Sequence, residues 1–88
     1  MPARCPARIL IADDHAVVRE GLKALFERQP DLQVTAEAVD GVEAVEKATS
    51  AEIDLAVLDV AMPRLTGLQA VREISRRRSD LPILLLSM

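Results

Sequence analysis

The feature that most constrains the fold is an alternation between short apolar or β-branched runs and segments with the period of a helix. The runs that predict strands cover residues 9–12, 32–38, 53–58 and 82–87. Strands that alternate with helices form a parallel sheet with right-handed crossovers. We therefore expect an α/β fold with a doubly wound parallel sheet and the element order βαβαβαβ.

Three segments between these runs carry apolar residues at the spacing of one helix face. The positions expected to face the sheet are Val18, Leu22, Leu25 and Phe26, then Val42, Val45 and Ala48, and finally Leu68, Val71 and Ile74. Asp14 is expected to cap the first helix, and Asp40 with Glu43 forms a capping-box pattern before the second. Gly21 costs about 1 kcal/mol relative to alanine within a helix, so we expect close packing there.

The composition is that of a small globular domain without a general affinity for nucleic acid. Half of the 88 residues are hydrophobic and the formal net charge is -3, which argues against a nucleic-acid binder. The basic run Arg76-Arg77-Arg78 is expected to be a solvated helix end, where cations complement the helix dipole. No apolar run approaches the roughly 20 residues that a membrane span requires.

Residues 1–7 are expected to form a leader outside the folded domain, which would cover residues 8–88. The leader contains the single cysteine, Cys5, so no internal disulfide can form, as is usual in a reducing compartment. It lacks the long apolar stretch of a signal peptide. We therefore expect a cytoplasmic protein.

Three carboxylates stand where folds of this class bind their ligands. Asp13 and Asp14 come directly after the first apolar run, and Asp59 follows the third. In a doubly wound sheet the first and third strands are neighbours at the switch point, so their carboxyl ends meet. Three uncompensated carboxylates repel one another, and Mg²⁺ would remove that cost because it prefers oxygen ligands.

Each of these residues also has a simpler interpretation. Asp14 could be only a helix cap, Asp13 a solvated strand end, and Ser87 an ordinary polar residue after a strand. Asp59 is harder to explain in this way, because an acid directly after a buried run is costly unless it is paired or binds a metal. The three acids together favour a metal or phosphate site.

The motifs resemble those of the receiver domain of bacterial two-component response regulators along nearly the whole chain. Residues 9–15, ILIADDH, are similar to the first strand and acidic pair, and residues 59–67, DVAMPRLTG, to the phosphoacceptor loop. Residues 39–44, VDGVEA, resemble the start of the second helix, and residues 84–87, LLLS, the fourth strand with its hydroxyl residue. Together with residues 19–22, REGL, the acidic motif is most similar to the LuxR/FixJ-type subfamily, whose second domain is a helix-turn-helix.

The resemblance implies a flavodoxin-like fold and a role for each matching residue. Asp59 would attack a phosphoryl donor, normally a sensor histidine kinase, and form an acyl phosphate. Mg²⁺ would be held by Asp13, Asp14, Asp59 and the backbone carbonyl of Ala61. Ser87 would hydrogen-bond the phosphoryl group and report its presence.

The resemblance also suggests roles for three neighbouring residues. Pro63 and Gly67 would shape the loop after Asp59, since proline fixes φ and glycine permits φ > 0. His15 is expected to be a polar residue at a helix start rather than a phosphate carrier, because the family's carrier histidine belongs to the partner kinase.

The family has five βα units in the strand order 2-1-3-4-5, whereas this chain ends after the fourth strand. Compared with the family, we therefore expect the chain to lack the fifth βα unit, the lysine that follows the fifth strand and any DNA-binding domain. The expectation is a truncated receiver whose fourth strand is an exposed edge. We expect such a chain to associate with another copy, by edge pairing or by swapping elements, and to make no direct contact with nucleic acid.

Three functions are therefore considered. The first is a phosphoacceptor signalling domain that normally controls a DNA-binding output domain. The second is a receiver fragment that takes no phosphate and acts only by dimerisation or domain swapping. The third, an Mg²⁺-dependent phosphotransferase of the haloacid-dehalogenase kind, needs a second acid two residues after the nucleophile, where this chain has Ala61.

Overall fold

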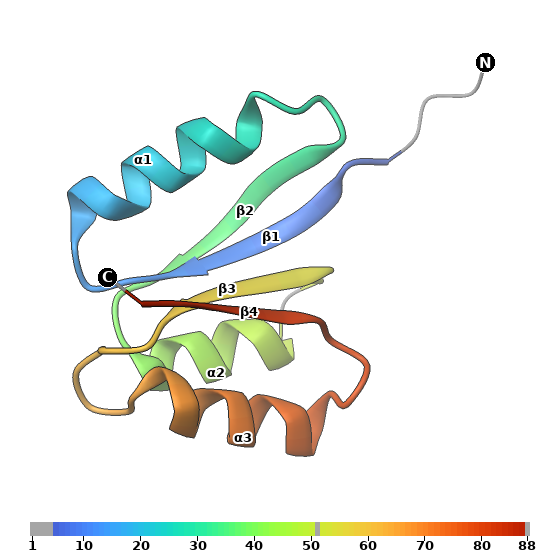
Figure 1. Ribbon diagram of the computed structural model, residues 1–88. Coiled ribbons are helices and arrows are strands. Elements are labelled where there is room, and N and C mark those ends of the chain that lie inside the picture. Colours follow the sequence, from blue (N-terminus) through green and yellow to red (C-terminus); the bar gives the residue numbers. More distant parts are fainter. Residues whose placement is uncertain (1–4, 51, 88) are drawn as a thin grey trace.

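The computed structural model of the chain describes residues 5–50 and 52–87. Its elements are β1 (Ala7–Ala12), α1 (Ala16–Glu27), β2 (Leu32–Ala38), α2 (Gly41–Ser50), β3 (Leu55–Asp59), α3 (Gly67–Arg77) and β4 (Ile83–Leu86) (Figure 1). The four strands are parallel and lie in the order β2-β1-β3-β4. The expected α/β class, the element order and the placement of β1 beside β3 are confirmed.

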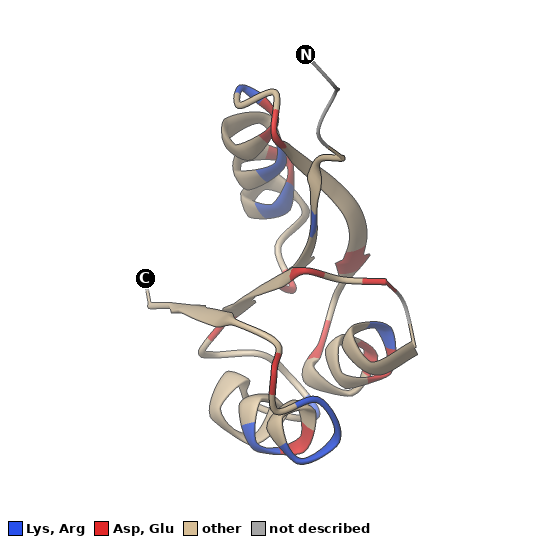
Figure 2. Ribbon diagram, turned by 90° about the vertical axis from the view of Figure 1, so that its right-hand side faces the viewer, with Lys and Arg blue, Asp and Glu red and all other residues tan. Residues whose placement is uncertain are grey.

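Helices cover both faces of the sheet, with α1 on one face and α2 and α3 on the other (Figures 1 and 2). Among the described strands only Arg8 of β1 is basic, and the other described arginines and lysines lie on helices and loops (Figure 2). At the end of α3, Arg76 pairs with Glu73 at 3.0 Å, and Arg78 donates to the Ala48 carbonyl at 3.1 Å. Arg76 and Arg77 are thus exposed at this helix end, as expected, whereas Arg78 contacts α2.

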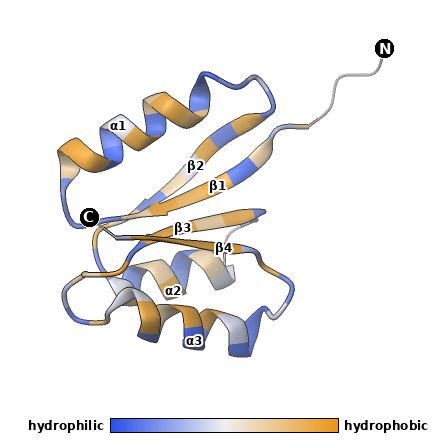
Figure 3. Ribbon diagram, viewed as in Figure 1, coloured by the Kyte–Doolittle hydropathy of each residue, from blue (hydrophilic) through white to orange (hydrophobic). Residues whose placement is uncertain are grey.

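The core lies in two layers because β1 is buried on both faces. Leu10 and Ala12 pack among the buried residues under α2 and α3, whereas Ile9 and Ile11 pack with the apolar side of α1. β3, β4 and most of β1 are accordingly hydrophobic along the ribbon, whereas the outer strand β2 also carries polar residues (Figure 3). Burial on both faces explains why the inner strands β1 and β3 are nearly continuous apolar runs.

Three strands have other limits than the apolar runs that predicted them, and β4, Ile83–Leu86, is one residue shorter at each end than its run 82–87. β1 begins at Ala7, two residues before its run, because the sheet extends past Arg8. β3 begins at Leu55 rather than Ile53, although Ile53 is only 2% exposed and belongs to the core. An apolar run therefore marked burial in both cases, and it did not mark the hydrogen-bonded limits of the strand.

Three residues predicted to face the sheet are exposed instead. Leu25 is 57%, Val42 38% and Leu68 58% exposed, so these predictions were wrong. The buried positions of α2 and α3 include several small residues, namely Gly41, Ala44 and Ala48 in α2 and Gly67 and Ala70 in α3. Small residues let the helices lie close to the sheet, and the bulkier residues beside them are turned outward.

The helix caps follow the prediction at α2 and depart from it at α1. Asp40 Oδ1 accepts from the Glu43 backbone N–H at 2.8 Å, but the Glu43 carboxylate accepts from Val39 N–H at 3.3 Å, one residue before the expected partner. The N-cap of α1 is His15 rather than Asp14, with no side-chain capping bond. The expected cap by Asp14 was therefore wrong, because its position lies one residue too early.

Gly21 is not in a crowded environment. A Cβ built at Gly21 would meet nothing within 4 Å outside its own helix. The expectation of close packing was wrong. Gly21 lowers the stability of the helix through its loss of conformational freedom on folding, with no packing gain in return.

Candidate metal and phosphoacceptor site

The topology brings the predicted acids together at the carboxyl edge of the sheet. β1 and β3 are parallel neighbours with Ala12 opposite Leu58, so Asp13 and Asp59 leave the two strands side by side. Carboxylate oxygens of Asp13, Asp14 and Asp59, with one ring nitrogen of His15, all lie within 4.8 Å of one another. Asp13 is 2% and Asp59 7% exposed, so two of the three carboxylates in the cluster are buried.

Few donors satisfy these carboxylates. Asp13 Oδ1 accepts from the backbone N–H of His15 at 2.8 Å and lies 3.1 Å from His15 Nδ1, while Asp59 Oδ1 accepts from Ala61 N–H at 3.2 Å. Within residues 5–50 and 52–87, no arginine or lysine forms an ion pair with any of the three acids. Buried carboxylates without a cationic partner are costly.

These donors fit a hard divalent cation. Mg²⁺ takes oxygen ligands, commonly one or two carboxylates and several waters, and the cluster offers carboxylate oxygens from three residues at the rim of the sheet. The positive charge of such an ion would offset the repulsion among the acids. The chemistry of the donor set therefore agrees with the Mg²⁺ site expected from the sequence.

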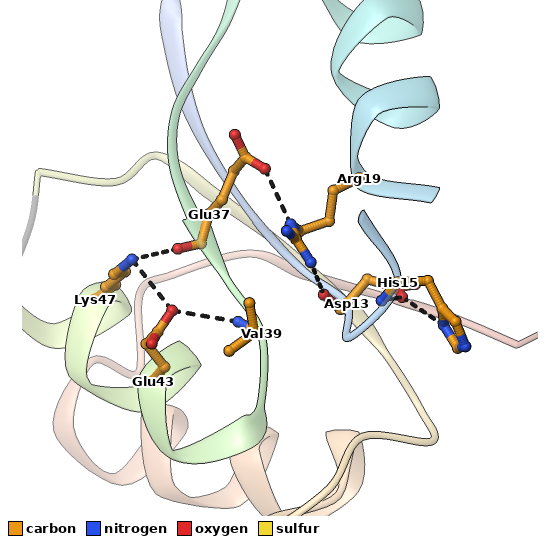
Figure 4. A network of polar contacts seen from close by, with 7 residues as sticks. All are labelled: Asp13, His15, Arg19, Glu37, Val39, Glu43 and Lys47. Carbon is orange, nitrogen blue, oxygen red and sulfur yellow. Dashed lines mark hydrogen bonds and ion pairs between the residues drawn. The ribbon is translucent and has the colours of Figure 1, made fainter. Parts of the chain in front are cut away.

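A polar network fixes the backbone beneath the cluster (Figure 4). Arg19 of α1 donates to the Asp13 carbonyl at 2.8 Å and to the Glu37 carboxylate at 3.0 Å. Lys47 of α2 donates to the Glu37 carbonyl and, at 3.3 Å, to Glu43. Arg19 was not predicted as a site residue; it holds the main chain at Asp13 and leaves the carboxylate open.

The loop between β3 and α3 folds tightly back on the end of β3. Gly67 N–H donates to the Val60 carbonyl at 2.9 Å. A Cβ on Gly67 would lie 2.8 Å from Val60 Cα and still closer to the Asp59 carbonyl. Gly67 does not use the positive φ that glycine permits, and the residue of this loop with a positive φ is Arg64, at 66°. Glycine is required at position 67 for close approach.

Arg64 also joins this loop to α2. Its Nε lies 2.9 Å from Asp40 Oδ2. The N–H of Glu43, followed by the Arg64 guanidinium, lowers the pKa of the Asp40 carboxyl below its ordinary value. A Cβ on Gly41 would lie 2.6 Å from the carbonyl carbon of Leu65, so α2 and the loop touch through their main chains. This contact was not predicted.

Ser87 and Ala61 lie at the same edge of the sheet. Leu86 of β4 is opposite Asp59 of β3, and Val60 N–H donates to the Leu86 carbonyl at 2.9 Å. Ser87 therefore follows β4 beside the strand that carries Asp59, and it is exposed. Ala61 is exposed as well, two residues after Asp59.

Such a sheet is that of a flavodoxin-like domain, and the acidic cluster at the carboxyl ends of β1 and β3 could hold a cation at the edge where folds of this class bind their ligands. The family model for the response regulator receiver domain matches residues 9–88. The chain therefore belongs to the receiver domain family of two-component response regulators.

Similar proteins place the chain near the LuxR/NarL-type regulators. It is 41% identical over 80 residues to the transcriptional regulatory protein LiaR of Bacillus subtilis. These aligned residues cover 91% of this chain and 38% of LiaR. A protein-glutamate methylesterase/protein-glutamine glutaminase of Pyrococcus horikoshii is 40% identical over 80 residues, 91% of this chain and 22% of that protein. The chain thus spans well under half of these relatives.

Solved structures agree in fold. A LuxR-family two-component response regulator from Aurantimonas sp. superposes with a TM-score of 0.90 at 38% identity, covering 94% of this chain and 59% of that one. In the described part of this chain, none of the helices is long and apolar enough to cross a membrane.

Proposed function

We propose that this chain is the phosphoacceptor portion of a response regulator and that Asp59 accepts the phosphoryl group in an Mg²⁺-dependent reaction. The observation that carries the proposal is the convergence of a buried Asp59 with Asp13 and Asp14, without an arginine or lysine paired to them in the described residues. A structural acid at this depth would be expected to have such a partner.

In the proposed reaction an Asp59 carboxylate oxygen attacks the phosphorus of a phosphohistidine on a sensor kinase. A P–O bond forms to Asp59, the P–N bond to the kinase histidine breaks, and its electron pair leaves with the imidazole. Mg²⁺, held by Asp13, Asp14, Asp59 and the Ala61 carbonyl, would supply positive charge for the phosphoryl oxygens. Ser87 would donate its hydroxyl to the phosphoryl group. The tight turn at Gly67 holds the Asp59 main chain in place.

The output is proposed from the relatives. A transcriptional regulator and a methylesterase both resemble this chain over most of its length, so the receiver itself does not specify the output. The LuxR-family likeness favours a cytoplasmic protein whose DNA-binding domain contacts nucleic acid, while the receiver portion does not.

Intact mass after incubation with Mg²⁺ and acetyl phosphate tests the phosphoacceptor proposal. We expect the mass of one phosphoryl group to be gained, and the gain to vanish with EDTA and in Asp59→Asn. Asp54→Asn, an acid just before β3 and away from the cluster, is the matched control and should retain the gain. A gain that survives in Asp59→Asn would contradict the proposal.

A second function, self-association, is favoured by one observation. β4 pairs only with β3 among the described strands, and Leu84 on it is 47% exposed. An apolar strand edge is a template for pairing, and we propose a second copy of this chain as its partner. Sedimentation velocity should show a dimer that Leu84→Lys disrupts and Val17→Lys, on exposed α1, does not. A monomer at all concentrations would contradict it.

A further inference from the structure

The loop between β3 and α3 contains a strained turn at Arg64. Leu65 N–H donates to the Pro63 carbonyl at 2.7 Å, and Arg64 between them has a φ of 66°, the one positive φ among residues 5–50 and 52–87. A hydrogen bond from residue i+2 to residue i around a positive φ makes a γ-turn of the rare, strained kind. Backbone strain of this sort persists only where surrounding contacts hold it, and it gathers at functional sites.

The Arg64 side chain makes a contact that can hold this turn. Its Nε and Nη2 both lie 2.9 Å from Asp40 Oδ2, and the Asp40 side chain is only 11% exposed. The other oxygen of Asp40 accepts from Glu43 N–H at 2.8 Å, so the carboxylate itself is fixed at the start of α2. Beside it, a Cβ on Gly41 would meet the main chain of Leu65. The turn is therefore tied to α2, which begins at the same end of the domain as the loop (Figure 1).

The same loop orients the phosphoacceptor candidate. Ala61 N–H donates to Asp59 Oδ1 at 3.2 Å, three residues before Arg64. The two residues between Ala61 and Arg64 leave little freedom to absorb a movement of the turn, because Met62 is only 5% exposed and Pro63 has a fixed φ. A displaced turn would thus change the position of the N–H group that orients Asp59.

We propose that Arg64 is a positioning residue for phosphorylation: by holding the strained turn against Asp40, it keeps the Asp59 carboxylate in the orientation that attacks phosphorus. The inference rests on the proposed function, since it says how the same site is held ready. Arg64 acts through Ala61 and does not touch the phosphodonor. Reacting groups must meet within a narrow range of geometry, and a misplacement of about 1 Å can slow a reaction about 100-fold. Loss of the contact with Asp40 should therefore lower the maximum rate.

The kinetics of phosphorylation by acetyl phosphate in Mg²⁺ separate positioning from charge attraction. Because the Arg64 side chain is 61% exposed, the alternative is that it attracts an anionic donor, which would change the half-saturating donor concentration. We expect Arg64→Gln to lower the maximum rate about fivefold and to leave the half-saturating concentration within about twofold. Arg77→Gln removes the same charge from the exposed far end of α3 and should change neither. An unchanged maximum rate in Arg64→Gln would overturn the inference.

Asp40→Asn tests the contact from its other side. Asparagine is a good N-cap residue, but its amide group replaces one of the two oxygens that accept from Glu43 N–H and from Arg64. If the two side chains act through one contact, each single variant and the double variant should lose about the same rate. Losses that add in the double variant would mean two independent effects and would overturn the inference.

Amide NMR of the loop gives a readout that does not depend on phosphorylation. In Arg64→Gln we expect the Ala61 and Leu65 amides to shift and to become more mobile, while circular dichroism shows the fold retained. A slower reaction with an unchanged loop would mean that Arg64 acts on the donor directly, and positioning would be refuted. If Asp59 is phosphorylated equally fast in all variants, only this inference fails. If the unsubstituted chain takes no phosphoryl group on Asp59, the proposed function fails as well.

Discussion

Replacing Gly41 by alanine should destabilise the protein, although alanine is the better helix former. A Cβ at this position would lie 2.6 Å from both the carbonyl carbon and the Cβ of Leu65, and closer still to the carbonyl oxygen. Carbon atoms pack best at about 3.5 Å, so the chains would have to separate by at least about 0.9 Å, and by more to clear the carbonyl oxygen. The obstacle is main chain and cannot rotate away.

The size of the destabilisation follows from two opposing contributions to the free energy of unfolding. Alanine gains up to about 1 kcal/mol over glycine in a helix, while forcing extra atoms into a packed contact costs about 1–3 kcal/mol. We expect a net loss of up to about 2 kcal/mol in the free energy of unfolding, which lowers Tm by roughly 4–8 °C per kcal/mol in a domain of this size. The displaced loop carries Arg64 and follows Asp59, so the proposed phosphorylation of Asp59 should slow too.

Gly21→Ala is the matched control. It lies in α1, and its Cβ would meet nothing within 4 Å, so it should stabilise the protein by about 0.4–1 kcal/mol. Urea unfolding followed by far-ultraviolet circular dichroism suits both variants, because the chain has no tryptophan or tyrosine. If Gly41→Ala proved as stable as Gly21→Ala, the close contact between α2 and the loop after β3 would be refuted.

Two further predictions concern the caps and the loop. Because hydrogen bonds from Glu43 N–H and Arg64 lower the pKa of Asp40 in the folded state, its contribution to stability is present above the unfolded pKa of about 3.9 and is lost as the pH falls below it. Asp40→Asn should therefore be less stable than the wild type at pH 7, with a smaller difference at pH 3; denaturant midpoints at both pH values measure this, and a constant difference would contradict it. Thr66 accepts from Gln69 N–H at 3.3 Å in a reciprocal capping box, so Thr66→Ala should lose about 1 kcal/mol in thermal unfolding. Thr66→Ser should retain most of the stability that Thr66→Ala loses. An equal loss of stability in the two variants would argue against a capping role for Thr66.

The sheet and the acidic cluster could be predicted from sequence because both depend on pattern and topology. Apolar runs alternate with helical stripes, and only one neighbour relation, β1 beside β3, is needed to bring Asp13 to Asp59. The Thr66-x-x-Gln69 pattern before α3 also carried a capping signal, which was overlooked.

Other features depend on packing between distant segments and leave no periodic signal. The pairing of Arg64 with Asp40 joins residues 24 positions apart, and the outward turn of Val42 and Leu68 follows from how closely α2 and α3 approach the sheet. The position of His15 beside two carboxylates depends on where α1 begins, one residue later than the expected cap implied.

Identification of the modified residue is the most direct test of Asp59 as the phosphoacceptor. After incubation with Mg²⁺ and acetyl phosphate, borohydride reduction converts an aspartyl phosphate to homoserine, which peptide mass spectrometry locates. We expect homoserine at position 59 and at no other aspartate, with none formed when Mg²⁺ is removed. Homoserine at Asp13 or Asp14, or formation at position 59 that is indifferent to Mg²⁺, would contradict it.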